Sequence, residues 1–151
     1  KDEGFNPVPN FAARSIPNRA FLEDKLIILT QDVGIDQVLT IGGSVDKPVG
    51  EFSDTMQVIY TGLYDLYGIT RIGLAGHPEG SPDISDEAIA AALAWKNGFA
   101  ARSDAEFYLV TQFCFEAAPV IAWTTASNFE SPTTISSFTF GRKSTTYSAP
   151  R

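Results

Sequence analysis

The sequence predicts an α/β fold built on a parallel β-sheet, and two observations predict it. Short apolar runs without strict alternation are each followed by a longer amphipathic stretch, which is the pattern of a buried strand followed by a helix. These runs recur about every 30–35 residues, which leaves room for one helix between strands. Right-handed crossovers between parallel strands are the default for such a pattern.

In the first half of the chain we expect strands over residues 7–13 and 37–41 and helices over residues 18–33 and 55–67. Prolines weaken the first strand because proline cannot donate to a β-ladder. Gly34 and Gly68 follow the last apolar positions of the two helices, as helix-stopping glycines do. A polar loop over residues 42–54 separates the second strand from the second helix.

In the second half we expect strands over residues 71–76 and 106–111, a helix that Ser85 or Asp86 caps and that reaches about Ala101, and a helix from about Ala117. The loop over residues 77–83 is dense in turn residues. From residue 124 the composition shifts to serine and threonine. We therefore expect a domain over residues 1–123 and an irregular tail over residues 124–151, with one short alternation at Phe138 and Phe140.

Charge and composition exclude several classes of protein. The 151 residues carry a net charge of −7, with a pI of about 4.5, which argues against nucleic-acid binding. No apolar run reaches the ~18 residues that a membrane span needs, and no secretory signal is visible. The single cysteine, Cys114, fits a reducing compartment, so we expect a cytoplasmic protein. The first residue is Lys1, so we expect a processed product or a fragment.

Polar residues follow the expected strands directly, at the edge where parallel sheets bind ligands. Residues 42–44 read Gly-Gly-Ser, which suits either a phosphate cradle or a tight structural turn. His77 is the one histidine, and it suits ligand contact, acid–base work or a structural hydrogen bond. One histidine among scattered carboxylates predicts no metal site.

Two further positions carry candidate chemistry. Gln112 directly follows the fourth expected strand, and its amide can both donate and accept toward a heterocycle or can satisfy the loop. Phe113 and Phe115 flank Cys114, which we interpret as a small buried hydrophobe without a base to activate it. Lys96 lies on an otherwise apolar helix and could reach a phosphate, form a salt bridge or remain solvated.

Three sequence motifs give more specific information than these single residues. They are RIGLAGHPEGSPD over residues 71–83, YLVTQFCFE over residues 108–116 and NPVPNFAAR over residues 6–14. With these motifs the chain resembles the methylenetetrahydrofolate reductase family, in its bacterial methylenetetrahydrofolate reductase-like branch. The resemblance implies a (β/α)8 TIM barrel, present here as about four βα units over residues 5–123.

The resemblance also implies an activity. Such a flavoprotein binds FAD, accepts a hydride from NADH or NADPH, and reduces 5,10-methylenetetrahydrofolate in one-carbon metabolism and methionine biosynthesis. By match to the motifs, His77, Glu79, Ser81 and Lys96 would bind the cofactor. Gln112 would hydrogen-bond the folate with Phe113 and Phe115 shaping its pocket, and Ser44 and Gln112 would be the catalytic positions.

The chain departs from this family where Ser44 replaces an aspartate near the flavin, which removes a charge. Asn10 stands where the branch often has histidine, and the family's proton-donating glutamate would lie upstream of Lys1. The leading interpretation is therefore a fragment of a reductase-like oxidoreductase. The alternative is a truncated, non-catalytic flavin- or folate-binding relative that needs a partner chain, such as a further copy of itself. A third interpretation is a small α/β binding domain unrelated to folate.

Overall fold

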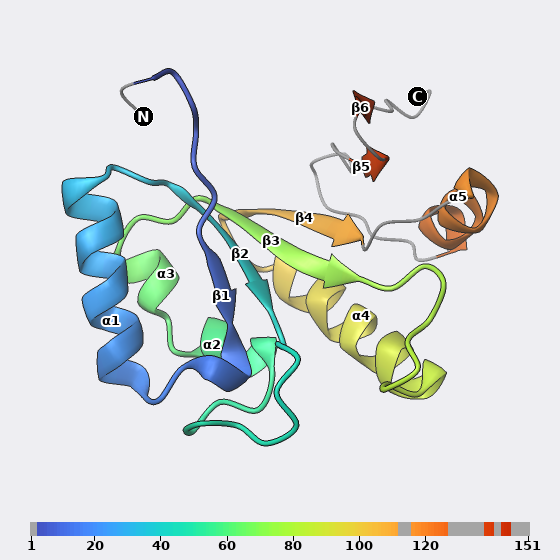
Figure 1. The fold of residues 1–151 in the computed structure, drawn as a ribbon, viewed down its shortest axis with the longest axis horizontal. Coiled ribbons are helices and arrows are strands. Elements are labelled where there is room, and N and C mark those ends of the chain that lie inside the picture. The colour runs from blue at the N-terminus through green and yellow to red at the C-terminus, as the bar shows by residue number, and fades with distance from the viewer. Residues whose placement is uncertain (1–2, 112–115, 127–137, 141–142, 146–151) are drawn as a thin grey trace. The chain divides into compact units, whose positions relative to one another are not determined.

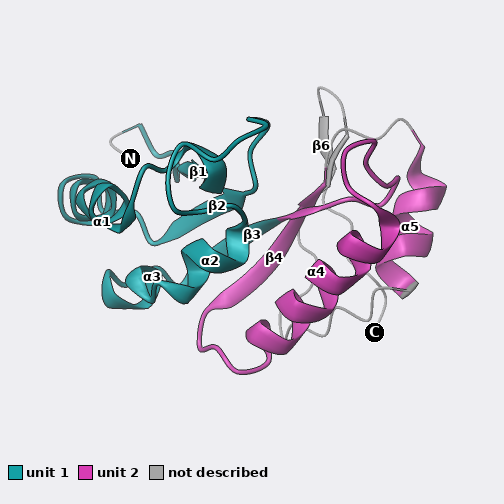
Figure 2. Ribbon diagram, turned by 90° about the horizontal axis from the view of Figure 1, so that it is seen from below, with its two compact units in different colours: residues 1–74 teal, residues 75–151 magenta. Residues whose placement is uncertain are grey.

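The computed structural model describes residues 3–111, 116–126, 138–140 and 143–145. The chain divides into two compact units, residues 1–74 and residues 75–151, which Figure 2 colours separately. The predicted boundary at residue 123 is a different division, and it stays a prediction.

Four strands form one parallel sheet in the order β1-β2-β3-β4, so the predicted α/β class with a parallel sheet is confirmed (Figure 1). The strands are β1 (Asn10–Ala12), β2 (Gln37–Ile41), β3 (Arg71–Gly76) and β4 (Glu106–Thr111). Asn10 pairs with Leu39, and Val38 pairs with Ile72. β1 is shorter than the predicted strand over residues 7–13, because Pro7 and Pro9 cannot donate to the ladder.

The first predicted helix changes its geometry before it ends. α1 (Arg19–Ile27) begins at Asn18, whose side chain accepts a hydrogen bond from the Phe21 amide at 2.9 Å. A π-helical turn over Ile28–Asp32 then completes the segment that the sequence predicted as one helix. Its residues are not buried, whereas Leu22 and Leu26 of α1 are fully buried.

The second predicted helix is two helices, so the expectation of one helix over residues 55–67 is wrong. Asp54 caps α2 (Thr55–Tyr60), and α3 (Leu63–Leu66) follows after a break. Gly62 adopts φ +70° at the break, a left-handed conformation that a regular helix excludes. The apolar spacing continues across the break, because Val58, Ile59 and Leu63 are all buried.

One polar pair lies inside the core of the first unit. The phenol of Tyr64 on α3 and the hydroxyl of Thr40 on β2 are 2.7 Å apart, and both residues are buried. The Tyr64 ring also lies 6.2 Å from the ring of Phe11 on β1. Burial raises the pKa of the Tyr64 phenol well above its usual value, so it stays protonated.

The second unit is built around the aromatic face of α4 (Asp86–Ala100), which Ser85 caps as predicted. Trp95 and Phe99 stack at 5.2 Å, and Phe99 meets Phe107 of β4 edge-on at 5.7 Å. α5 (Ala117–Ala126) begins at the expected residue and buries Val120.

The predicted irregular tail contains some regular structure. β5 (Phe138–Phe140) and β6 (Lys143–Thr145) form an antiparallel pair, and the expectation of an irregular tail over residues 124–151 otherwise stays a prediction. The alternation of Phe138 and Phe140 is the sequence signal for this pair. α5 also continues to Ala126, past the predicted boundary. Among the helices formed by described residues, none is both long and apolar enough to cross a bilayer.

The Thr40–Tyr64 pair gives a stability prediction. Tyr64→Phe leaves the buried Thr40 hydroxyl without its partner, so we expect a loss of about 1–2 kcal/mol in the free energy of unfolding. Urea unfolding followed by circular dichroism measures this loss. Tyr60→Phe, at a residue that is 63% exposed, is the control and should change little.

The double variant Thr40→Val/Tyr64→Phe removes both polar groups together. It should be more stable than the two single changes predict by addition, because no polar atom is left unpaired. Strictly additive losses would show that the hydrogen bond does not couple the two residues.

Candidate functional site

The predicted site residues fall into both units. Ser44 follows β2 in the first unit, whereas His77, Glu79 and Ser81 follow β3 in the second unit, together with Lys96 on α4. Whether Ser44 and His77 converge on one ligand stays a prediction. Gln112, Cys114 and the flanking Phe113 and Phe115 lie outside the described residues, so their predicted roles also stay predictions.

Glycines let the loop after β2 pack closely against the segment that follows β1. Gly43 adopts φ +92°, and a Cβ there would lie 3.2 Å from the Cβ of Ala12. A Cβ on Gly50 would overlap the backbone carbonyl of Pro17, so a side chain at residue 50 has no room. The chain bends at Ser44, which is exposed, and whether residues 42–44 form a phosphate cradle or a structural turn stays a prediction.

Arg14 binds this loop at several points. Its Nε donates to the carbonyl of Ser53 at 3.0 Å, and its guanidinium also donates to the carbonyl of Val45 at 3.4 Å. Its backbone amide donates to Gly42, and its carbonyl accepts from the Val49 amide at 2.8 Å. One residue thus contacts both ends and the middle of the loop that carries Ser44.

The loop after β3 is a series of tight turns. The Gly80 amide donates to the carbonyl of His77 at 3.2 Å, and Gly80 adopts φ +75°. Ser81 pairs with Ile84 in an isolated bridge, and its hydroxyl accepts from the Asp83 amide at 3.4 Å. The loop then ends at Ser85, where α4 begins.

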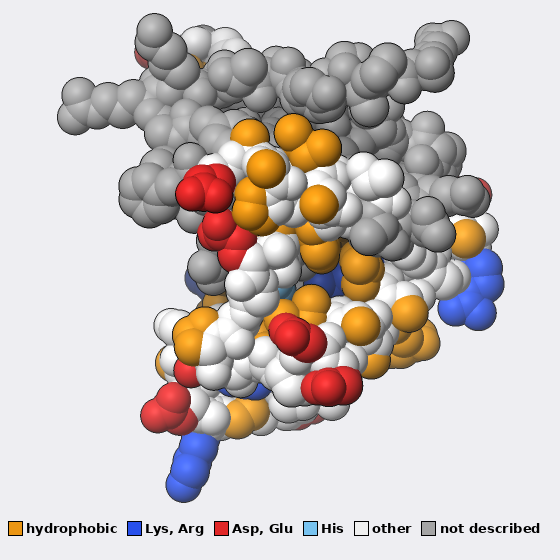
Figure 3. Space-filling view, turned by 90° about the vertical axis from the view of Figure 1, so that its right-hand side faces the viewer, with side chains coloured by type: hydrophobic (Ala, Val, Ile, Leu, Met, Phe, Trp, Pro, Cys, Tyr) orange, Lys and Arg blue, Asp and Glu red, His pale blue; other side chains and the backbone are white. Residues whose placement is uncertain are grey.

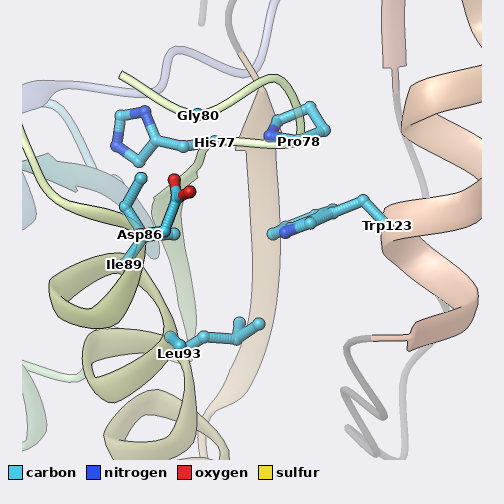
Figure 4. A pocket seen from close by; sticks show the side chains of 8 residues that line it. His77, Pro78, Gly80, Asp86, Ile89, Leu93 and Trp123 are labelled. Atoms are coloured by element: carbon cyan, nitrogen blue, oxygen red, sulfur yellow. The ribbon is translucent and has the colours of Figure 1, made fainter. Parts of the chain in front are cut away.

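This loop borders an open hollow of about 290 Å³ in the second unit. Its lining comes from the loop after β3, from the first half of α4 and from α5, namely His77, Pro78, Gly80, Asp86, Ile89, Ala90, Leu93 and Trp123. Figure 4 shows Trp123 extending from α5 on one side, with Asp86 and Ile89 on the other. Figure 3 shows apolar side chains gathered on this face, with acidic side chains among them.

The imidazole of His77 is held in its neutral form. Partial burial of the ring lowers the pKa of His77 below its usual value, and the positive charge of Lys96 lowers it further. Its Nδ1 atom is buried and has no hydrogen-bond partner among the described residues. A neutral imidazole offers one donor and one acceptor, so Nδ1 is a buried polar atom whose hydrogen-bonding capacity the described residues do not use.

Lys96 is buried, so of its three expected surroundings the solvated one is wrong, whereas its role in cofactor binding stays a prediction. Its side chain is 8% exposed, and its Nζ donates to the carbonyl of Ala75 at 2.8 Å. Burial lowers the pKa of Lys96 to about 8, which still leaves the amine mostly protonated at neutral pH. Glu79, by contrast, is exposed, and Ser81 is half-buried.

Sequence reasoning missed three residues that shape these loops. Arg14 belongs to a quoted motif, but its partners are 31 and 39 residues away, beyond any local pattern. Asp86 was considered only as a helix cap, and Trp123 marked only the end of the resemblance. The spacing of Val120 and Trp123 on α5 was the available signal, because residues three apart share a helix face.

No model of a known protein family matches this chain. Within the described residues, no group of three or more His, Cys, Asp or Glu side chains could hold a metal ion. The family, cofactor and substrate that the motifs imply therefore stay proposals.

The Arg14 contacts predict how the loop after β2 responds to mutation. Arg14→Met removes the guanidinium bonds to Val45 and Ser53, so we expect faster hydrogen exchange across residues 45–53. Amide exchange followed by NMR or mass spectrometry measures this change. Lys47→Met removes an exposed charge from the same loop and should leave exchange unchanged. Equal exchange in both variants would contradict the role of Arg14.

Proposed function

We propose that the chain is part of a flavin-dependent oxidoreductase similar to methylenetetrahydrofolate reductase. Its reaction would transfer a hydride from NADH or NADPH to a bound flavin and then to 5,10-methylenetetrahydrofolate. The proposal includes the (β/α)8 barrel, of which the four parallel strands would be one part. The motifs over residues 71–83 and 108–116 are its basis in the sequence.

The observation that carries the proposal is the placement of the His77 loop. The loop leaves the carboxyl end of a buried parallel strand, which is where α/β folds bind their ligands. It presents a neutral histidine with an unpartnered Nδ1 beside a mostly apolar hollow. An apolar surface with a few polar groups is the usual lining of a site for a flat heterocycle.

The residues fit one portion of FAD better than another. His77 suits the isoalloxazine ring, whose edge carries both hydrogen-bond donors and acceptors. When bound, the flavin would supply the hydride-transfer chemistry that no side chain of this chain can supply. Lys96 fits the diphosphate less well, because its ammonium already donates to Ala75 and is buried.

Flavin binding and reduction test this function directly. The purified chain, mixed with FAD, should quench flavin fluorescence, and NADH or NADPH should then bleach the flavin absorbance without oxygen. His77→Leu should weaken FAD binding about tenfold, since one hydrogen bond to a buried group contributes roughly 1–2 kcal/mol. Arg102→Gln, at an exposed residue of the same unit, is the control. Absence of FAD binding by the unmodified chain would refute the proposal.

The folate half-reaction separates the two positions proposed as catalytic. Ser44→Asp restores a charge where the resembled family keeps an acid, so reoxidation of the flavin by 5,10-methylenetetrahydrofolate should become faster. Gln112→Leu should slow this reoxidation more than it slows reduction by NADH or NADPH. Stopped-flow absorbance measures each half-reaction separately. Equal slowing of both by Gln112→Leu would remove that residue from the folate site.

One observation favours the second candidate, a non-catalytic flavin- or folate-binding relative. Ser44 carries no charge, and the loop that holds it is nevertheless firmly tied by Arg14. A loop that keeps its conformation although it lacks the family's aspartate at residue 44 suits a protein that binds flavin or folate without catalysing its reduction. FAD binding without bleaching by either nicotinamide, in the unmodified chain and in Ser44→Asp, would support this candidate over the reductase.

A further inference from the structure

The environment of Lys96 differs from that of a phosphate-binding lysine. Its Nζ donates to the carbonyl of Ala75 at 2.8 Å, and only 8% of the residue is exposed. Ala75 is the second-last residue of β3, so the ammonium is fixed directly beneath the point where the loop begins. A phosphate-binding lysine instead needs an ammonium that the ligand can reach.

A buried ammonium is costly, and a role in packing does not explain it. A leucine or methionine in this place would fill the same space without desolvating a charge. The Lys96 side chain comes from the same helix that packs Trp95 and Phe99. A charge in such apolar surroundings acts strongly on its neighbours, because the local dielectric is low.

The charge of Lys96 acts on the protonation of His77. The charge of Lys96 and the burial of the ring both act to lower the pKa of His77. Two carboxylates lie in the same region, Asp86 in the lining of the hollow and Glu79 in the loop. Burial is the largest cause of the lowered pKa of His77, and the charge of Lys96 is the second.

We propose that Lys96 is a positioning residue for the His77 loop, which it fixes through its hydrogen bond to the carbonyl of Ala75. Its charge also acts on the imidazole of this loop. The inference rests on the proposed function in one respect, namely that this loop contacts the flavin. It replaces the expectation that Lys96 binds the FAD diphosphate. It also specifies the ligand portion at this loop as an uncharged heterocyclic edge, because a neutral imidazole both donates and accepts.

The single histidine makes the electrostatic part measurable without any ligand. The Hε1 NMR signal of His77 is the only histidine signal, so its pH titration needs no assignment. Lys96→Met should raise the titration midpoint of His77, whereas Lys96→Arg keeps the charge and should leave the midpoint low. Lys25→Met, at an exposed lysine, is the control. An unchanged midpoint in Lys96→Met would overturn the proposal.

The unmodified chain gives a second readout in case the Lys96 variants do not fold. The pKa of Lys96 is about 8, so loss of its proton should produce a second, smaller inflection of the His77 signal near that pH. Lys96→Arg should lack this inflection. A flat His77 signal above pH 7 in the unmodified chain would contradict the coupling.

Flavins with and without a diphosphate separate positioning from phosphate binding. FAD carries the diphosphate and riboflavin does not. If Lys96 bound the diphosphate, its replacement would weaken the binding of FAD only. We expect Lys96→Met to weaken both flavins by the same factor, measured by fluorescence quenching. A loss confined to FAD would overturn the positioning role. If the unmodified chain binds neither flavin, the proposed function fails, and the His77 titration alone decides the role of Lys96.

Discussion

The structure depends on the burial of β3 as a parallel strand. Ile72, Gly73 and Leu74 are buried in succession, so both faces of the strand are covered. A strand that is covered on both faces carries mostly apolar side chains, and a tight hairpin cannot connect it to a parallel neighbour. Polar residues therefore lie after the end of the strand, and the long connection to the next strand provides a loop that can form a site. The His77 loop follows from this constraint.

Two cationic side chains, Arg14 and Lys96, donate hydrogen bonds to backbone carbonyls, but they differ in how deeply they are buried. Backbone carbonyls in the loop after β2 and near the end of β3 accept hydrogen bonds from these two side chains. Arg14 donates to two such carbonyls, at Val45 and Ser53, from a half-buried position. Lys96 donates to one, at Ala75, from a buried position. The buried cation has the additional electrostatic effect on a neighbouring imidazole, whereas the half-buried one is largely screened.

The sequence predicted the elements whose signals lie within the element itself, such as an apolar run or a capping residue. The bounds of β2 and β3 match the apolar runs, and Ser85 was a recognisable cap. The break at Gly62 was not predicted, because the apolar spacing continues through it. The contacts of Arg14 and Lys96 join residues that are 21 to 39 positions apart, and no periodicity encodes such pairs. The burial of Lys96 could not be predicted from its position either, since a charged residue on a helix is usually solvated.

Binding of a flavin at the His77 loop is the central claim, and one titration tests it most directly. Riboflavin is added to the chain while the Hε1 NMR signal of His77 and the flavin fluorescence are recorded on the same samples. The account predicts that the His77 signal moves and saturates together with the fluorescence quenching. Quenching that saturates while the His77 signal stays in place would contradict it, because the flavin would then bind elsewhere.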